Sequence, residues 1–136
     1  MASRFRRSKR AVNAAVDAET KLLDGGVLRI YGGTQPEHAD LPVGNLPLSR
    51  PLLAEIVLNN PAFMPADNGV ATARQTLKDE NAKGGGTATW FRATGADGTA
   101  VWDGSVGTAD SDLVLPVLLI QAGTVVDVVR LSYGTR

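Results

Sequence analysis

Apolar residues near the start of the chain recur at helical spacing. Val12, Ala15, Val16, Leu22 and Leu23 fall at steps of three, four and seven residues, with Glu19 on the same stripe. This spacing predicts an amphipathic helix over residues 11–23. The two glycines at 25 and 26 suit the left-handed residue that ends many helices. A helix this short needs packing against the domain or a partner, and the sequence leaves both open.

From residue 27 onward the spacing changes to short alternating or β-branched segments. An Asp97-Gly98 pair between two of them predicts a hairpin turn that brings Trp102 opposite Trp90 and Phe91. Turn residues recur about every 8–12 positions, a pattern typical of antiparallel β-proteins. The predicted strands cover residues 27–31, 52–58, 69–76, 87–94, 100–106, 112–120 and 125–133, with Pro116 splitting the sixth.

These elements predict one all-β domain. We expect an antiparallel β-sandwich or jelly-roll-like domain of seven to eight short strands, with a short N-terminal helix. The predicted organisation is a basic arm over residues 1–10 and a single domain over 11–136, whose β body spans 27–133. A chain of 136 residues can bury a core of this kind without a metal or a disulfide.

Proline interrupts the pattern most strongly between residues 34 and 51. Pro36, Pro42, Pro47 and Pro51 exclude a helix or a central strand there. A loop of this length in a small domain is usually functional or lies along a partner. We therefore predict partner contacts for Pro36, Pro42 and Pro47.

Charge divides the chain into two unequal parts. The total of 14 basic and 14 acidic residues balances, but five of the basic ones are Arg4, Arg6, Arg7, Lys9 and Arg10. The remaining 126 residues carry 9 basic and 14 acidic side chains, a net charge of −5. A segment of this kind is ordinarily a solvated, disordered terminus. As partner-binding residues, these five cations are expected to meet an acidic protein surface or, as an alternative, nucleic acid.

The residue inventory offers little for catalysis. The chain lacks cysteine, which excludes disulfides, thiolate metal sites and thiol nucleophiles. None of Ser49, Ser105, Ser111 and Ser132 is the centre of a nucleophile-elbow motif. Neither Gly32-Gly33 nor Gly84-Gly85-Gly86 has the residues of a phosphate-binding loop. We predict a non-enzymatic protein without catalytic, cofactor-binding or metal-binding residues.

Three groups of residues are weaker candidates for chemistry, because an ordinary structural role explains each of them better. His38 with Glu37 and Asp40 could form an acid–base or metal group, although adjacent ligands in one proline-flanked loop rarely do so. Calcium could use the aspartates near the C-terminal turns, although an EF-hand spacing is absent. Trp90, Phe91 and Trp102 could form a platform for sugar stacking, although core packing suits them better. The aspartates in question are Asp97, Asp103, Asp110 and Asp112.

The order of several short motifs resembles a known family. Leu22-Leu23-Asp24-Gly25-Gly26 is followed by Leu28-Arg29-Ile30-Tyr31-Gly32-Gly33, and later by Pro61-Ala62-Phe63 and Asn68-Gly69-Val70-Ala71. Ala88-Thr89-Trp90-Phe91-Arg92, the run from Asp97 to Gly107, Asp112-Leu113 and Ala122-Gly123 complete the pattern. This layout resembles small structural proteins found in tailed-bacteriophage genomes. The resemblance covers most of residues 11–133, carries over no catalytic residue and excludes the basic arm.

The resemblance implies a virion structural protein. We expect a capsid decoration (cement) protein that bridges capsid subunits, with the major capsid protein or other virion proteins as partners. A tail, connector or fibre-associated protein is the alternative, with a lectin-like adsorption role as its variant. We expect a homo-oligomer, for which a trimer is one suitable arrangement, and no membrane partner, because no apolar run approaches the length of a bilayer span. Assembly would take place in the host cytoplasm.

Overall fold

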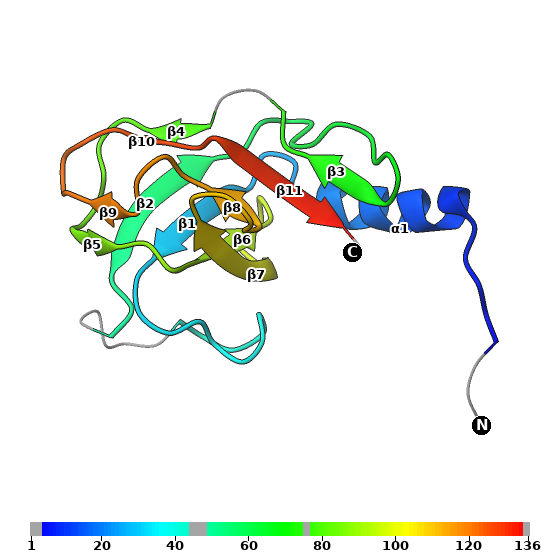
Figure 1. The fold of residues 1–136 in the computed structure, drawn as a ribbon, viewed down its shortest axis with the longest axis horizontal. Coiled ribbons are helices and arrows are strands. Elements are labelled where there is room, and N and C mark those ends of the chain that lie inside the picture. The colour runs from blue at the N-terminus through cyan, green and yellow to red at the C-terminus, as the bar shows by residue number, and fades with distance from the viewer. Residues whose placement is uncertain (1–3, 44–48, 75–76, 135–136) are drawn as a thin grey trace.

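A computed structural model describes residues 4–43, 49–74 and 77–134 of the chain. These residues form one helix and eleven short strands. The helix lies at one end of a β body, and the N-terminal segment extends from it away from the body (Figure 1). In order, the elements are α1 (Lys9–Lys21), β1 (Val27–Tyr31), β2 (Leu52–Val57), β3 (Val70–Thr72), β4 (Lys78–Asp79), β5 (Gly86–Thr87), β6 (Trp90–Thr94), β7 (Ala100–Gly107), β8 (Leu113–Val114), β9 (Leu119–Ile120), β10 (Val126–Asp127) and β11 (Arg130–Gly134).

The β body is built around one large sheet. Its seven strands follow the order β2-β1-β6-β7-β8-β11-β3, and two-stranded sheets β10-β4 and β5-β9 lie beside it. All pairs in the large sheet are antiparallel except β7 with β8, so the sheet is mixed. The prediction of a mostly β chain with one short helix is confirmed for the described residues. The strand predicted over 27–31 is found at Val27–Tyr31.

The β6–β7 hairpin forms where predicted, but its register differs from the expected one. Gly98 has a φ of 85°, which glycine adopts without strain, and the backbone N–H of Gly95 donates to Thr99 at 2.9 Å. Trp102 pairs with Ala93, whereas Trp90 pairs with Ser105. Because side chains alternate along a strand, the two tryptophans lie on opposite faces of the sheet. The expectation that Trp102 lies opposite Trp90 and Phe91 was therefore wrong, and an irregularity between Ala93 and Thr94 shifts the register.

One face of the central strands forms the apolar core. Leu28 and Ile30 of β1 are completely buried, and Phe91 and Ala93 of β6 lie on the same face. Gly104 faces Phe91 across the hairpin, where a Cβ atom would come within 2.5 Å of the Phe91 ring. Any larger residue at this position would push the ring out of the core. The cluster extends to Val16 and Leu23 of the N-terminal segment and to Ile120 and Val126 of the small sheets.

The opposite face of the same strands carries a row of charges. The register places Glu55 beside Arg29, Arg29 beside Arg92, and Arg92 beside Asp103. Like charges directly opposite each other destabilise a sheet. Here each arginine pairs with the acid on its outer side, Arg29 with Glu55 at 2.8 Å and Arg92 with Asp103 at 2.6 Å. Each of the two neighbouring arginines therefore has an acid on its other side, and these ion pairs offset the repulsion between the arginines.

Helix α1 turns polar side chains toward the body. Asn13, Asp17 and Asp24 accept hydrogen bonds from the backbone N–H groups of Gly69, Ala66 and Ala62, each at 2.8 Å. These contacts fix the segment between β2 and β3 along the helix. The helix begins at Lys9, two residues before the predicted start, and the Ser8 side chain caps it by accepting from Ala11 N–H at 3.1 Å. Within the described residues, α1 is neither long nor apolar enough to cross a membrane.

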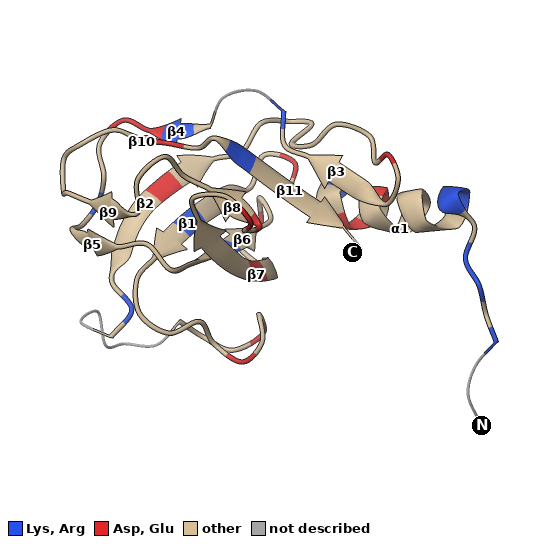
Figure 2. Ribbon diagram, in the orientation of Figure 1, with Lys and Arg blue, Asp and Glu red and all other residues tan. Residues whose placement is uncertain are grey.

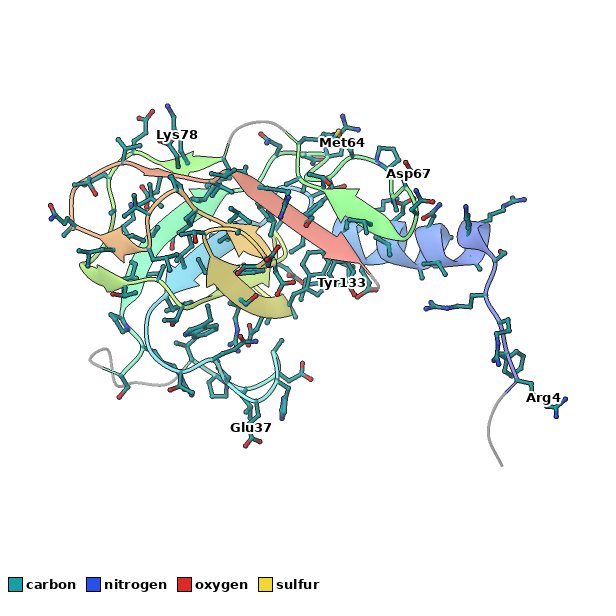
Figure 3. The ribbon with its side chains drawn as sticks, in the orientation of Figure 1. Arg4, Glu37, Met64, Asp67, Lys78 and Tyr133 are labelled. Atoms are coloured by element: carbon teal, nitrogen blue, oxygen red, sulfur yellow. The ribbon has the colours of Figure 1, made fainter. Side chains whose placement is uncertain are left out.

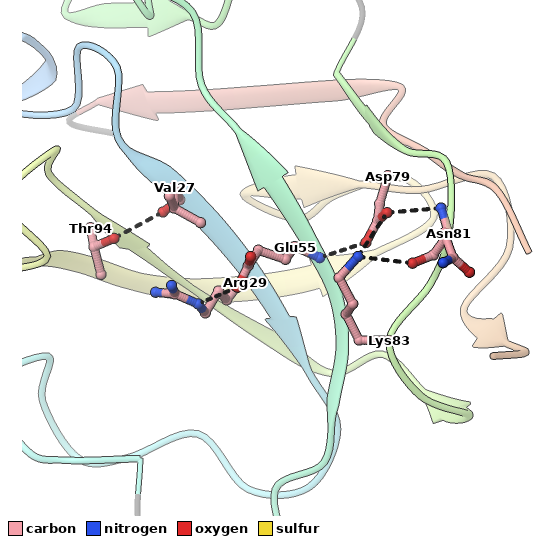
Figure 4. A network of polar contacts seen from close by, with 7 residues as sticks. All are labelled: Val27, Arg29, Glu55, Asp79, Asn81, Lys83 and Thr94. Atoms are coloured by element: carbon pink, nitrogen blue, oxygen red, sulfur yellow. Dashed lines mark hydrogen bonds and ion pairs between the residues drawn. The ribbon is translucent and has the colours of Figure 1, made fainter. Parts of the chain in front are cut away.

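A buried carboxylate joins the small sheet β10-β4 to the large one (Figure 4). Asp79 is only 6% exposed, and its two oxygens accept from the N–H groups of Glu55 at 2.8 Å and Asn81 at 2.9 Å. Burial alone would raise the pKa of Asp79, but these hydrogen bonds and the nearby Lys83 outweigh it, so the pKa lies below its ordinary value. The ionised form of Asp79 therefore contributes to the stability of the fold.

We predict that Asp79→Asn lowers the free energy of unfolding by about 1–3 kcal/mol at pH 7. An amide can accept with only one of the two atoms that now accept from Glu55 and Asn81. Because the native pKa lies below the ordinary 3.8, the contribution of Asp79 is complete above pH 3.8 and is lost as the pH falls through the native value. Urea unfolding of both proteins between pH 7 and pH 2 measures the difference. Asp127→Asn, in the exposed part of β10, is the control and should change the free energy of unfolding by less than about 0.5 kcal/mol. If the loss caused by Asp79→Asn persisted unchanged at low pH, that result would contradict the charge argument.

Candidate functional site

Basic residues gather on the N-terminal segment and at the start of α1 (Figure 2). Arg4, Arg6 and Arg7 are exposed and lie on extended chain before the helix. Lys9 and Arg10 are exposed too, but they belong to the first turn of α1 and are not part of an extended arm. Residues 4–8 are called the arm below. Figure 3 shows Arg4 far from the body.

The proline-rich loop lies against the charged face of the sheet, and its described residues are 34–43 and 49–51. Arg50 closes its base by donating to the carbonyls of Thr34 at 2.7 Å and Val43 at 2.8 Å. Trp90 Nε1 donates to the carbonyl of Gly32 at 3.1 Å, which fixes the start of the loop on β6. The loop therefore covers part of a face that would otherwise expose Trp90.

The predicted contact prolines do not share one environment. Pro36 is buried and presents little surface to a partner, whereas Pro42 is exposed. Pro47 lies outside the described residues. Of the two described prolines, Pro42 is the one placed where it could contact a partner without movement of the loop.

A cavity of about 310 Å³ opens between this loop and the strands β7 and β11. The loop contributes Gln35, Glu37, His38 and Ala39 to its lining. The strands and their connections contribute the remainder: Phe91, Trp102, Asp103, Gly104, Asp112, Leu131, Ser132, Tyr133 and Gly134. An apolar floor with acidic walls could admit a small cationic or hydrogen-bonding group.

Two stacked rings form part of that floor. The Trp102 and Tyr133 rings lie 3.9 Å apart with an interplanar angle of 16°, and Phe63 meets Trp102 edge-on at 5.7 Å. Both polar ends of the stack meet Glu19 of α1: the Tyr133 hydroxyl donates to it at 2.6 Å and Trp102 Nε1 at 3.4 Å. Burial, together with the Glu19 carboxylate, raises the pKa of Tyr133 to about 12. The tyrosine therefore stays protonated at physiological pH and acts as a hydrogen-bond donor.

Two of the carboxylates that line the cavity are already engaged in hydrogen bonds. Asp103 accepts from Arg92 Nε at 2.6 Å and from Nη2 at 2.9 Å, and both side chains are less than 10% exposed. The hydrogen bond to Asp103 raises the pKa of Arg92 despite the opposing effect of burial. Asp112 likewise accepts from the N–H and the hydroxyl of Ser105, each at 3.0 Å. These engagements suit structural roles better than proton transfer or metal ligation.

The remaining candidates for chemistry do not gather into one site. Glu37 and His38 line the cavity, while Asp97 lies at a different hollow. Within residues 4–43, 49–74 and 77–134, no three His, Asp or Glu side chains are grouped to hold a metal ion. Trp90 is fully buried and stacks on Tyr31 at 4.6 Å. With Trp102 on the other face, the two tryptophans cannot form one sugar-stacking platform.

A second hollow was not evident from the sequence. It measures about 530 Å³ and lies between the end of α1 and the tip of the β6–β7 hairpin. Its lining combines apolar Leu22, Ala96, Ala100 and Val101 with acidic Glu19, Asp24 and Asp97. We call it the hairpin groove. Leu22 was expected on the apolar stripe of the helix, but it lies just after the helix and is 61% exposed at the groove.

We predict that Asp103→Ala lowers the free energy of unfolding by about 3–5 kcal/mol, because it leaves the Arg92 charge buried without a partner. The double variant Arg92→Leu/Asp103→Leu should recover most of this loss, since it removes both charges together. Glu55→Ala, in the same row but in an ion pair more than one third exposed, is the matched control and should cost about 0–1 kcal/mol. Chemical denaturation of the four proteins makes the comparison. Equal losses for Asp103→Ala and Glu55→Ala would show that burial does not set the strength of these pairs.

Comparison with known proteins adds no relative from which a role could be transferred. No protein-family model, no curated protein and no solved structure matches this chain.

Proposed function

We propose that this chain is a structural protein of a tailed-bacteriophage virion, and that it decorates the capsid by binding between neighbouring subunits. The observation that carries the proposal is the separation of charge along the molecule. Basic residues occupy the arm and the start of α1, whereas the body holds an excess of acidic residues. A molecule with complementary charges on separate parts is suited to repeated contacts within an assembly.

The start of α1 supports a role in binding. Lys9 and Arg10 lie in the first turn, which holds no acidic residue. Cations at the positive end of a helix dipole are unfavourable, by about 0.3–1 kcal/mol each at an exposed site. An acidic surface placed against this turn would offset that cost. We infer that the exposed cations serve contact with an acidic partner, for which the candidates are the major capsid protein, another virion protein or a further copy of this chain.

The polar groups with catalytic chemistry support a structural role rather than an enzyme. Asp103, Asp112, Tyr133 and Glu19 are each engaged in hydrogen bonds that hold the fold. We also propose that the large sheet and the two small ones form a sandwich or jelly-roll arrangement. The support is one continuous core that includes Leu28 of the large sheet and Ile120 and Val126 of the small ones.

The alternative location is the tail, the connector or a fibre, which would use the same features at a lower copy number. Its lectin-like variant has less support, because Trp90 is buried and Trp102 is only 9% exposed. The proposed site of assembly remains the host cytoplasm.

Quantitative mass spectrometry of virions purified from the phage that encodes the chain tests the proposal. We expect a large fixed ratio of this protein to the major capsid protein, because a decoration protein covers the whole shell. A handful of copies per particle would favour the tail, connector or fibre. Absence from the particles would exclude the virion proposal. Particles that lack the protein should also release their DNA at a lower temperature if it stabilises the head.

A further inference from the structure

We propose that the arm of one molecule binds in the hairpin groove of a second copy of the same chain. The inference deepens the proposed function, because it names the acidic surface that the arm contacts and makes self-association part of assembly. It combines three observations: the shape and charge of the groove, the composition of the arm, and the reach of the arm.

The groove is lined by apolar and acidic side chains together. Leu22 and Val101 are among the apolar ones, and Glu19, Asp24 and Asp97 are the acidic ones. Glu19 is held by Tyr133, Asp24 accepts from Ala62 N–H at 2.8 Å, and Asp97 accepts from Thr99 N–H at 2.9 Å. Their carboxylates are therefore held in fixed positions, so a cation that binds them need not first order them.

The arm has the complementary composition. It carries Arg4, Arg6 and Arg7 around Phe5, whose side chain is 92% exposed. An aromatic ring flanked by arginines suits a hollow lined by apolar side chains and carboxylates. The ring can pack on the apolar side chains while the guanidinium groups pair with the carboxylates. Arginine also pairs with a carboxylate through two parallel hydrogen bonds, which favours it over lysine in such a contact.

The arm does not lie in the groove of its own molecule. It extends from the start of α1 away from the body (Figure 1), whereas the groove lies at the other end of the helix. Leu22 lies 13 residues beyond Lys9, about 20 Å along a helix at ~1.5 Å per residue. Phe5 lies four positions before Lys9, and a fully extended chain of that length spans only about 14 Å. A second molecule is therefore better placed to bring its Phe5 to the groove.

The outward side of α1 leaves room for this approach. Ala14, Ala15 and Ala18 are exposed, so short side chains lie between the start of the helix and the groove. Two molecules with their helices side by side and antiparallel would each bring an arm to the other's groove. Such a pair is isologous, with the same contact made twice.

Cysteine cross-linking tests the contact directly, since the chain has no cysteine of its own. Arg4→Cys/Ala96→Cys should form a covalent dimer on mild oxidation, with the peptide that contains residue 4 joined to the peptide that contains residue 96 in mass spectra. Arg4→Cys/Ala122→Cys is the matched control, because Ala122 is also an exposed alanine next to a turn but lies outside the groove. We expect the first variant to cross-link at least tenfold faster. Equal rates for the two variants would overturn the inference.

Sedimentation equilibrium of the cysteine-free protein tests the same contact without cross-linking. Arg6→Glu/Arg7→Glu should weaken self-association at least tenfold, whereas Lys78→Glu/Arg130→Glu, which reverses two exposed cations on the body, should leave it within twofold. A wild-type chain that stays monomeric at high concentration and low salt would overturn the inference. If such a monomer is still abundant in virions by mass spectrometry, the proposed function stands and the arm binds a different virion protein.

Discussion

The buried ion pair between Arg92 and Asp103 is the interaction on which the arrangement of the central sheet depends. It joins β6 to β7 on the face opposite the apolar core, and its two side chains are 9% and 4% exposed. Charges withdrawn from water this far are stable only with a close partner and a cover that keeps the pair in place. The loop at 34–43 supplies part of that cover, since Asp40 acts electrostatically on Arg92 and Pro36 is buried. The long proline-rich loop thus has a structural task as well as any role in binding.

Helix α1 packs on the body through apolar and polar side chains together. Val16 lies in the core. Asn13 and Asp17 of the helix, with Asp24 just after it, accept hydrogen bonds from backbone N–H groups of a segment that forms little regular structure. Side-chain oxygens that lose contact with water need hydrogen-bond donors, and the backbone N–H groups of an irregular segment need acceptors. The side chains and the segment therefore satisfy each other. Leu22 is left facing solvent at the border of the hairpin groove. The exposed apolar surface near α1 is therefore a consequence of how the helix is attached.

The mostly β character of the chain and several strand positions could be predicted from local pattern because they depend on neighbouring residues. The Asp97-Gly98 turn and the strand at Val27–Tyr31 are examples, since turn geometry and alternation act over a few residues. The register of Trp102 could not be predicted, because it depends on an irregularity at Ala93/Thr94 that shifts every later pair. The Glu19–Tyr133 contact spans 114 residues and leaves no local trace. The hairpin groove was missed for the same reason: its walls come from segments more than 70 residues apart, and only the folded chain brings them together.

The basic residues at the start of α1 affect both the stability of the helix and the proposed contact between molecules. Lys9 and Arg10 follow Ser8, whose cap starts the helix, so the helix begins where its dipole is least compatible with positive charge. A free molecule bears this cost, and a neighbour that presents carboxylates to the same turn removes it. In the proposed contact, Glu19, Asp24 and Asp97 of a second copy receive the arm that precedes this turn, and they do so without first losing side-chain freedom. Screening by salt acts on such an exposed contact far more than on the buried Arg92–Asp103 pair. The fold should therefore tolerate ionic strengths at which the proposed association between molecules would be lost.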